Sequence, residues 1–128
     1  MREPSPKRQR TLQLQERVFK FASALILRCP SGATDTASRE LWRQLVKAAT
    51  SASNSLEEAD EASSTADFIA KMKISVREAK EARRSLRFIV ECRLANGDKV
   101  AHLGDEARQI ASILATIVIN TKRRTEGK

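Results

Sequence analysis

Residues 67–90 carry two stripes at helical spacing, and this pattern narrows the possible folds more than any other feature of the chain. Apolar residues recur every three or four positions, which in an α-helix places them on one face, and Arg83 falls on the same face. These apolar residues are Ile69, Met72, Val76, Ala79, Leu86 and Val90. A second stripe, about a quarter turn away at ~100° per residue, is cationic and is called the basic stripe below: Lys73, Arg77, Lys80, Arg84 and Arg87. One helix therefore supplies part of the core and the strongest charge feature.

Three further segments show amphipathic spacing, and turn residues separate them. We predict helices over about 11–28, from Thr36 or Ser38 through the acidic residues 57–61, over 65–95, and over 98–121 with a local irregularity at Gly104. Pro and Gly are scarce and there is no Tyr, which disfavours a sheet protein. The fold class is therefore all-α: an antiparallel up-down four-helix bundle at 11–124, after a disordered basic arm at 1–10 and before a disordered tail at 125–128.

Several apolar residues lie away from the predicted core faces, and one bundle cannot bury them all. On the first helix they repeat every seven residues, which is not the pattern of scattered surface residues. We therefore predict self-association through this outer apolar set, which consists of Leu12, Phe19, Ile26, Ile74, Phe88 and Ile119.

Little in the sequence indicates an enzyme or a cofactor. His102 is the only histidine, and no Glu-x-x-His motif of a di-metal bundle and no phosphate-loop or dinucleotide signature is present. Cys29 and Cys92 form no metal-binding motif and are predicted to be reduced, half-buried thiols. Residues 1–10 have no apolar signal core and no run is long enough to cross a membrane, so we expect a cytoplasmic protein without catalytic residues, metal or cofactor.

The charge balance favours a polyanionic partner. The formal net charge is +8 at pH 7, and the basic stripe spans roughly 21 Å at ~1.5 Å per residue, which is enough to follow several phosphates. No aromatic array offers a base-stacking platform, so binding to the backbone of RNA or DNA is expected. The predicted nucleic-acid-binding residues are Lys73, Arg77, Lys80, Arg84, Arg87, Lys122, Arg123 and Arg124.

A second interpretation keeps the basic stripe inside the assembly. Four carboxylates crowd the end of the second helix, where the helix dipole disfavours them, and cations of the same or a neighbouring subunit would neutralise them. They are Glu57, Glu58, Asp60 and Glu61. The protein would then be a protein-interaction module rather than a nucleic-acid binder.

The central and last helices resemble a known family. The matching residues of the second and third helices are Gln44-Leu45, Ala48-Ala49, Ser51, Leu56-Glu57-Glu58-Ala59, Ala66-Asp67-Phe68-Ile69, Lys71-Met72, Ile74 and Arg77-Glu78-Ala79-Lys80-Glu81. In the last helix they are Ile110, Ala111, Ile113-Leu114 and Asn120-Thr121-Lys122-Arg123. The chain resembles the four-helix bundle family first noticed as open reading frames in intervening sequences of bacterial large-subunit ribosomal RNA genes. Where that family usually has Asn, four positions after Ser51, this chain has Ser55.

The resemblance carries its own expectations. It implies a ring-like homopentamer, without established enzymatic activity in the family. It also suggests kinship with the accessory protein of diversity-generating retroelements, which is similarly basic and binds a reverse transcriptase and nucleic acid. The sequence thus predicts a homo-oligomeric basic scaffold for nucleic acid, with a role beside a reverse transcriptase suggested by the resemblance alone.

Overall fold

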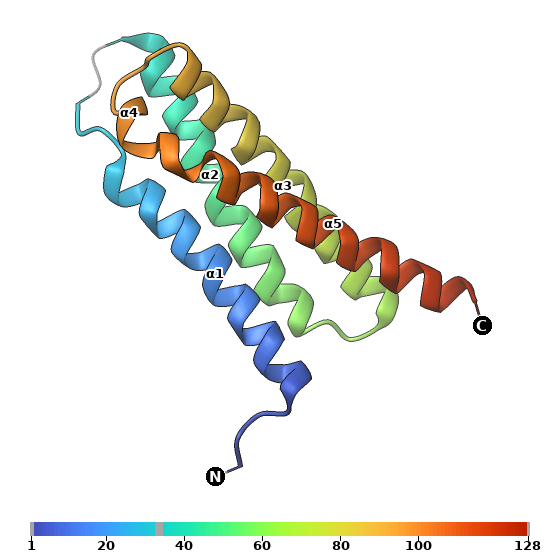
Figure 1. Cartoon of the computed structure of the whole chain (residues 1–128). Coiled ribbons are helices and arrows are strands. Elements are labelled where there is room, and N and C mark those ends of the chain that lie inside the picture. The colour runs from blue at the N-terminus through green and yellow to red at the C-terminus, as the bar shows by residue number, and fades with distance from the viewer. Residues whose placement is uncertain (1, 33–34, 128) are drawn as a thin grey trace.

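Four long helices form the bulk of the chain in a computed structural model that describes residues 2–32 and 35–127 (Figure 1). They are α1 (Pro6–Arg28), α2 (Thr36–Asp60), α3 (Thr65–Glu91) and α5 (Gly104–Glu126). A short helix α4 (Gly97–Val100) and a 3₁₀ turn η1 (Ala101–Leu103) join α3 to α5. No strand occurs among the described residues, so the all-α four-helix bundle is confirmed. The irregularity predicted at Gly104 takes the form of the 3₁₀ turn directly before it.

The pair α2 and α3 forms the most extensive helix contact of the molecule, and small side chains make it possible. Ala48, Ala52 and Ala59 of α2 are buried, as are Ala79 and Ala82 of α3. Inside this contact, the buried hydroxyl of Ser75 donates a hydrogen bond of 2.8 Å to the carbonyl oxygen of Ala52. Close approach of two helix backbones needs residues of this size at the contact.

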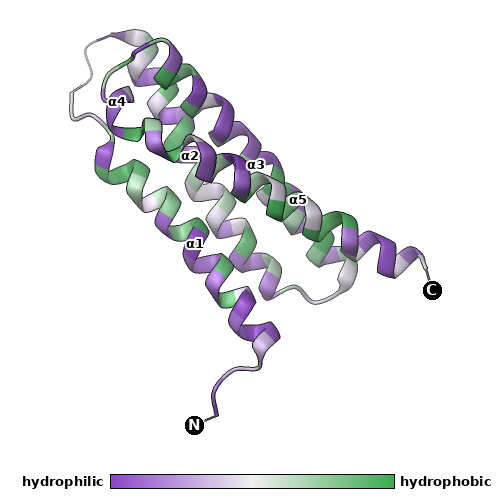
Figure 2. Cartoon of the chain, viewed as in Figure 1, coloured by the Kyte–Doolittle hydropathy of each residue, from purple (hydrophilic) through white to green (hydrophobic). Residues whose placement is uncertain are grey.

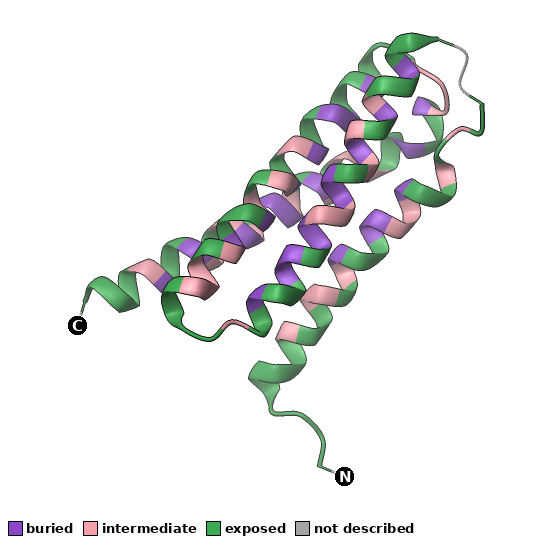
Figure 3. Ribbon diagram, turned by 180° about the vertical axis from the view of Figure 1, so that it is seen from behind, coloured by how far each residue is buried: buried purple, intermediate pink, exposed green. Residues whose placement is uncertain are grey.

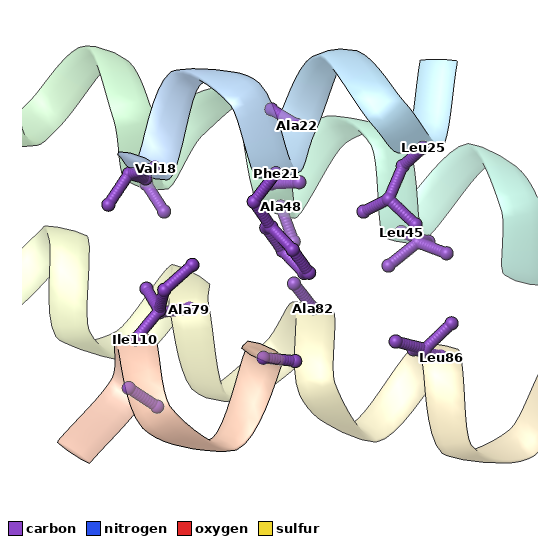
Figure 4. Packing of buried hydrophobic residues seen from close by; sticks show 14 of the residues in the cluster. Val18, Phe21, Ala22, Leu25, Leu45, Ala48, Ala79, Ala82, Leu86 and Ile110 are labelled. Atoms are coloured by element: carbon purple, nitrogen blue, oxygen red, sulfur yellow. The ribbon is translucent and has the colours of Figure 1, made fainter. Parts of the chain in front are cut away.

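The hydrophobic core gathers side chains from all four long helices (Figure 4). Leu25 and Leu45 are completely buried, and Ile110 of α5 is nearly so. In Figure 4 the side chains of Val18, Phe21 and Leu25 of α1 point towards α3 and α5. The other three segments with amphipathic spacing each bury one face, as expected. Their buried apolar residues include Val18, Phe21, Leu25, Leu45, Ala48, Ala52, Leu56, Val100, Ala107, Ile110 and Leu114.

The core face of α3 is rotated relative to the prediction. Met72, Ala79 and Leu86 are buried as expected, but Arg83 is exposed and does not lie on that face. The other fully buried positions are Ser75, Ala82, Ser85 and Ile89. Two of these positions are serine, and apolar periodicity does not assign a polar residue to the core. A closely packed neighbouring helix can nevertheless bury a small polar side chain, so the predicted face was wrong.

Several helix ends differ from the prediction because local capping decides them. The first helix begins at Pro6 rather than near Thr11, because Ser5 accepts a hydrogen bond from the Arg8 N–H (3.1 Å) and proline suits the first turn. Residues 6–10 of the predicted arm are therefore helical. At the other end α5 continues to Glu126, beyond the predicted end near Thr121. Met1 and Lys128, the outermost residues of the predicted arm and tail, lie outside the described residues.

The first turn of α2 holds the chain that follows α3. The cap of α2 is Asp35, not Thr36 or Ser38, since its carboxylate accepts from the Ser38 N–H at 2.7 Å. The Ser38 hydroxyl is buried and accepts from the Ala95 N–H at 3.0 Å, and the Trp42 indole N–H donates to the Ala95 carbonyl oxygen at 2.7 Å. The backbone N–H and the carbonyl oxygen of Ala95 therefore both have hydrogen-bond partners on α2.

The third helix ends at Glu91 rather than near Ala95. Arg93 adopts a left-handed conformation (φ 52°), and the Leu94 N–H returns to the Ile89 carbonyl oxygen at 3.0 Å. This is the hydrogen bond of a Schellman motif, which glycine usually forms at the position of Arg93. The start of α3 agrees with the prediction, because Ser64 caps it and accepts from the Asp67 N–H.

Hydrophobic and hydrophilic residues alternate along each long helix (Figure 2). Buried residues follow the inner faces, whereas the first turn of α1 and the last turn of α5 are exposed (Figure 3). None of the helices in the described ranges combines the length and the apolar character that a bilayer crossing requires.

Candidate nucleic-acid interface

The basic stripe lies on the exposed side of α3. All five of its residues are exposed, because the rotation of the core face towards α2 moves the stripe further from the core than predicted. On the last helix, Arg123 and Arg124 are exposed and Lys122 is half-buried. The described structure therefore leaves all eight predicted binding residues at least partly accessible.

A groove between α3 and α5 collects part of the stripe. It has a volume of about 590 Å³ and is called the basic groove below. Its lining residues are Lys80, Arg83, Arg84 and Arg87 of α3 with Arg108, Ala111, Ser112 and Ala115 of α5. The small side chains on α5 leave open the space that the cations of α3 border. Two of the five cations, Arg83 and Arg108, were not among the predicted binding residues.

Beyond the groove, α3 and α5 place another pair of cations together. The amine of Lys122 lies close enough to Lys73 to lower the pKa of the Lys73 ammonium group through their mutual contact and repulsion. Two like charges held in contact are stabilised by an anion between them. A row of cations therefore follows α3 and α5, from Lys73 and Lys122 at one end to Arg87 and Arg108 at the other.

The predicted binding residues at the end of α5 lie on two sides of the molecule. Lys122 faces α3, whereas Arg124 borders a hollow at the connection between α2 and α3 and donates a hydrogen bond of 3.3 Å to the Thr121 hydroxyl. Lys122 therefore joins the stripe and Arg124 does not.

Carboxylates near the stripe neutralise little of it. Within residues 2–32 and 35–127, its ion pairs are those of Arg77 with Glu78 (Nη2 to Oε1, 3.6 Å) and of Arg87 with Glu91 (Nε to Oε1, 3.8 Å). In the basic groove, Arg108 is also paired, with Asp105 at 2.8 Å. Exposed pairs of this kind contribute little energy, so a stronger anion can displace them.

The acidic cluster at the end of α2 has a different partner from the one that the second interpretation requires. Arg8 of α1 binds Asp60 through both carboxylate oxygens, at 2.6 and 2.7 Å, and thereby lowers the pKa of that carboxyl. Glu57, Glu58 and Glu61 are exposed and have no ion pair among the described residues. Within one subunit, then, the stripe and the acidic cluster do not meet.

The outer apolar set is exposed in every member. The exposed fractions of its residues are 39% for Leu12, 54% for Phe19, 48% for Ile26, 38% for Ile74, 57% for Phe88 and 49% for Ile119. Leu27, which the seven-residue pattern did not include, is also exposed. These side chains form the apolar surface that one bundle leaves uncovered, and self-association through them stays a prediction.

Phe88 differs from the rest of the outer apolar set in its surroundings. It lines a hollow of about 320 Å³ together with Arg84, Arg87, Glu91 and Cys92. Arg84 and Arg87 also line the basic groove, so the hollow and the groove adjoin. Sequence periodicity placed Phe88 on an outward face but could not show which cations lie beside it.

The two cysteines and the histidine lie at the surface. Cys29 and Cys92 are exposed rather than half-buried, because each follows the last turn of its helix as the C-terminal cap. His102 is exposed. At the position where the resembled family has Asn, Ser55 is buried, while Asn54 is exposed.

A family comparison supports the resemblance that the sequence suggested. The family model described as 23S rRNA-intervening sequence protein matches residues 10–116, which include most of α1, all of α2, α3 and α4, and about half of α5. The chain belongs to this family. Neither a curated protein nor a solved structure matches the chain.

The region that matches the family contains most of the candidate interface. The basic stripe and every residue of the basic groove lie inside residues 10–116. Lys122, Arg123 and Arg124 lie beyond the matched region.

Proposed function

We propose that this protein is a non-enzymatic, homo-oligomeric scaffold that binds the backbone of nucleic acid through its basic stripe. The observation that carries the proposal is the basic groove, in which α3 and α5 bring five cations around a single open space. The anionic groups of a nucleic acid are its backbone phosphates, and a row of arginine and lysine side chains can neutralise several of them.

RNA is the first nucleic acid to test. The name of the family places its members in ribosomal RNA genes and supports an association with RNA. In this account each subunit is an antiparallel up-down bundle, and the outer apolar set joins subunits into a ring, with five as the expected number. A ring would repeat the basic stripe and convert weak contacts into tight binding. A reverse transcriptase is a candidate protein partner, on the strength of the family resemblance.

Reversing three charges of the basic stripe tests the proposal. The substitutions Arg77→Glu, Lys80→Glu and Arg84→Glu replace exposed side chains, so the fold should tolerate them. We expect the triple variant to lose at least tenfold in affinity for RNA, measured by filter retention, while light scattering gives the mass of the wild type.

A matched control separates the stripe from net charge. The substitutions Lys20→Glu, Lys47→Glu and Lys99→Glu change the net charge equally at exposed positions of α1, α2 and α4. The control variant should retain most of the RNA binding. Equal losses in the two variants would contradict a localised site.

The second candidate function is a protein-interaction module whose basic stripe binds acidic residues of a neighbouring subunit. The exposed carboxylates of Glu57, Glu58 and Glu61 favour it, since no cation of the same described chain neutralises them. In that case the triple variant would dissociate into single chains, and RNA retention would change little.

A further inference from the structure

The hollow at Phe88 combines an accessible aromatic ring with two arginines of the basic groove. The ring is 57% exposed, and Arg84 and Arg87 border both the hollow and the groove. A ligand that occupies both places must therefore present negative charge and a flat apolar surface side by side. A nucleotide has this combination, in its phosphate and its base.

No other aromatic side chain of this protein has such a position. The chain has five, all among the described residues. Trp42 and Phe21 are buried in the core, and Phe68 packs against it. Phe19 is exposed, but it lies on α1, which contributes no residue to the groove.

We propose that the basic groove and Phe88 together form a binding site for single-stranded nucleic acid. The phosphates lie between α3 and α5, and an unpaired base stacks on the Phe88 ring. In a duplex both faces of each base are covered by its neighbours, so only an unpaired or terminal base can stack on the ring. This proposal rests on the proposed function and adds the class of nucleic acid.

A second copy of the chain is a poorer occupant of this hollow. A protein surface that covered Phe88 would also cover Arg84, which has no ion pair among the described residues, and Arg87, whose pair with Glu91 is 3.8 Å long. Burying guanidinium groups without close carboxylates is costly. A phosphate strand supplies the missing negative charge. We therefore assign Phe88 to the groove and leave the other five residues of the outer apolar set for the subunit interface.

The substitution Phe88→Leu tests this assignment, since it keeps an apolar side chain and removes the aromatic face. Binding of a labelled single-stranded oligonucleotide and of a duplex of equal length is measured by fluorescence anisotropy at one salt concentration. We expect about a 5- to 150-fold loss for the single strand, which is the range of one base stack, and less than a twofold change for the duplex. Phe88→Trp should retain single-strand binding.

Phe19→Leu is the matched control, because Phe19 is exposed to a similar degree, 54%, and lies outside the groove. Leucine keeps the apolar contact that Phe19 offers to a second subunit, so this variant should keep the mass of the wild type and leave both affinities unchanged. Light scattering of the Phe88→Leu variant should give the mass of the wild type.

Two results would overturn the assignment. Equal effects of Phe88→Leu on single strand and duplex would show that no base stacks there, and a lower mass would make Phe88 an interface residue. If the wild type bound neither nucleic acid, the proposed function itself would fail, and this inference with it.

Discussion

Gly97 occupies a position that no larger side chain fits without a shift of the backbone. A Cβ atom at this residue would lie 2.7 Å from the carbonyl oxygen of Ile89, in the last turns of α3. The contact joins the start of α4 to the end of α3, and Gly97 is itself buried. Because the obstructing atom belongs to the backbone, a rotamer change cannot relieve the clash.

We expect Gly97→Ala to lower the free energy of unfolding by about 1–3 kcal/mol, the usual range for inserting atoms into a close contact. Urea denaturation followed by circular dichroism measures the change. Gly104→Ala is the control, because a Cβ there meets nothing within 4 Å and the backbone is already helical (φ −61°). It should be neutral or stabilising by up to ~1 kcal/mol. Equal effects of the two substitutions would contradict the steric account.

At the level of the elements, α1 is joined to α5 by an ion pair between two half-exposed side chains. Arg17 donates from Nε and Nη2 to the two oxygens of Glu106, at 2.8 and 2.6 Å, and from Nη2 to Gln109 at 2.9 Å. The hydrogen bonds from Arg17 lower the pKa of the Glu106 carboxyl. Since α1 otherwise packs chiefly on α2, this pair helps to set the position of α1 across the bundle.

The Arg17 and Glu106 pair predicts a dependence of stability on pH. A carboxyl with a lowered folded-state pKa stabilises the fold above its ordinary value of about 4.3, and this contribution disappears as the pH falls through the folded-state value. We expect Arg17→Gln to cost about 0.5–1 kcal/mol at pH 7, as for other exposed pairs. In urea denaturation at a series of pH values, the difference from the wild type should shrink in acid. A difference that stays constant with pH would contradict the role of the pair.

The elements also show what the sequence could and could not predict. Apolar periodicity located all four long helices, because their central residues, such as Leu45 and Leu114, keep helical spacing. It misplaced the core face of α3, since Ser75 and Ser85 are buried by close packing against α2, and packing distance is not encoded in periodicity. The sequence offered Thr36 or Ser38 as the start of α2 and did not point to Asp35, which caps the helix. The hydroxyl of Ser38 instead accepts from the Ala95 N–H, a contact that depends on the fold.

For the candidate site, the sequence predicted the basic stripe of α3 and Lys122 of α5, but it did not predict Arg108 of α5. Arg108 lies alone on its helix face in the sequence, and only the packing of α5 against α3 brings it to Arg87. Arg83 was assigned to the core for the same reason that the core face was misplaced. A groove between two helices depends on how the helices are placed relative to each other. The residue periodicity of a single helix does not give that placement.

For the whole molecule, we predict that the outer apolar set causes the chain to self-associate. Light scattering at micromolar concentration should give a mass that is a multiple of the 14.3 kDa chain. Phe19→Lys places a charge in the middle of the exposed apolar residues of α1 and should lower that mass. Gln13→Lys, at an exposed polar position of the same helix, is the control and should not. A folded wild-type protein that remains a single chain would rule out this role of the set.

If the cations of α3 and α5 bind phosphates, binding must weaken as the salt concentration rises. The affinity of the wild-type protein for a single-stranded oligonucleotide is measured across a series of salt concentrations. If the five cations of the basic groove each replace a counterion, the logarithm of the association constant should fall linearly with the logarithm of salt concentration, with a slope of roughly −3 or steeper. An association constant that does not change with salt concentration would contradict the account.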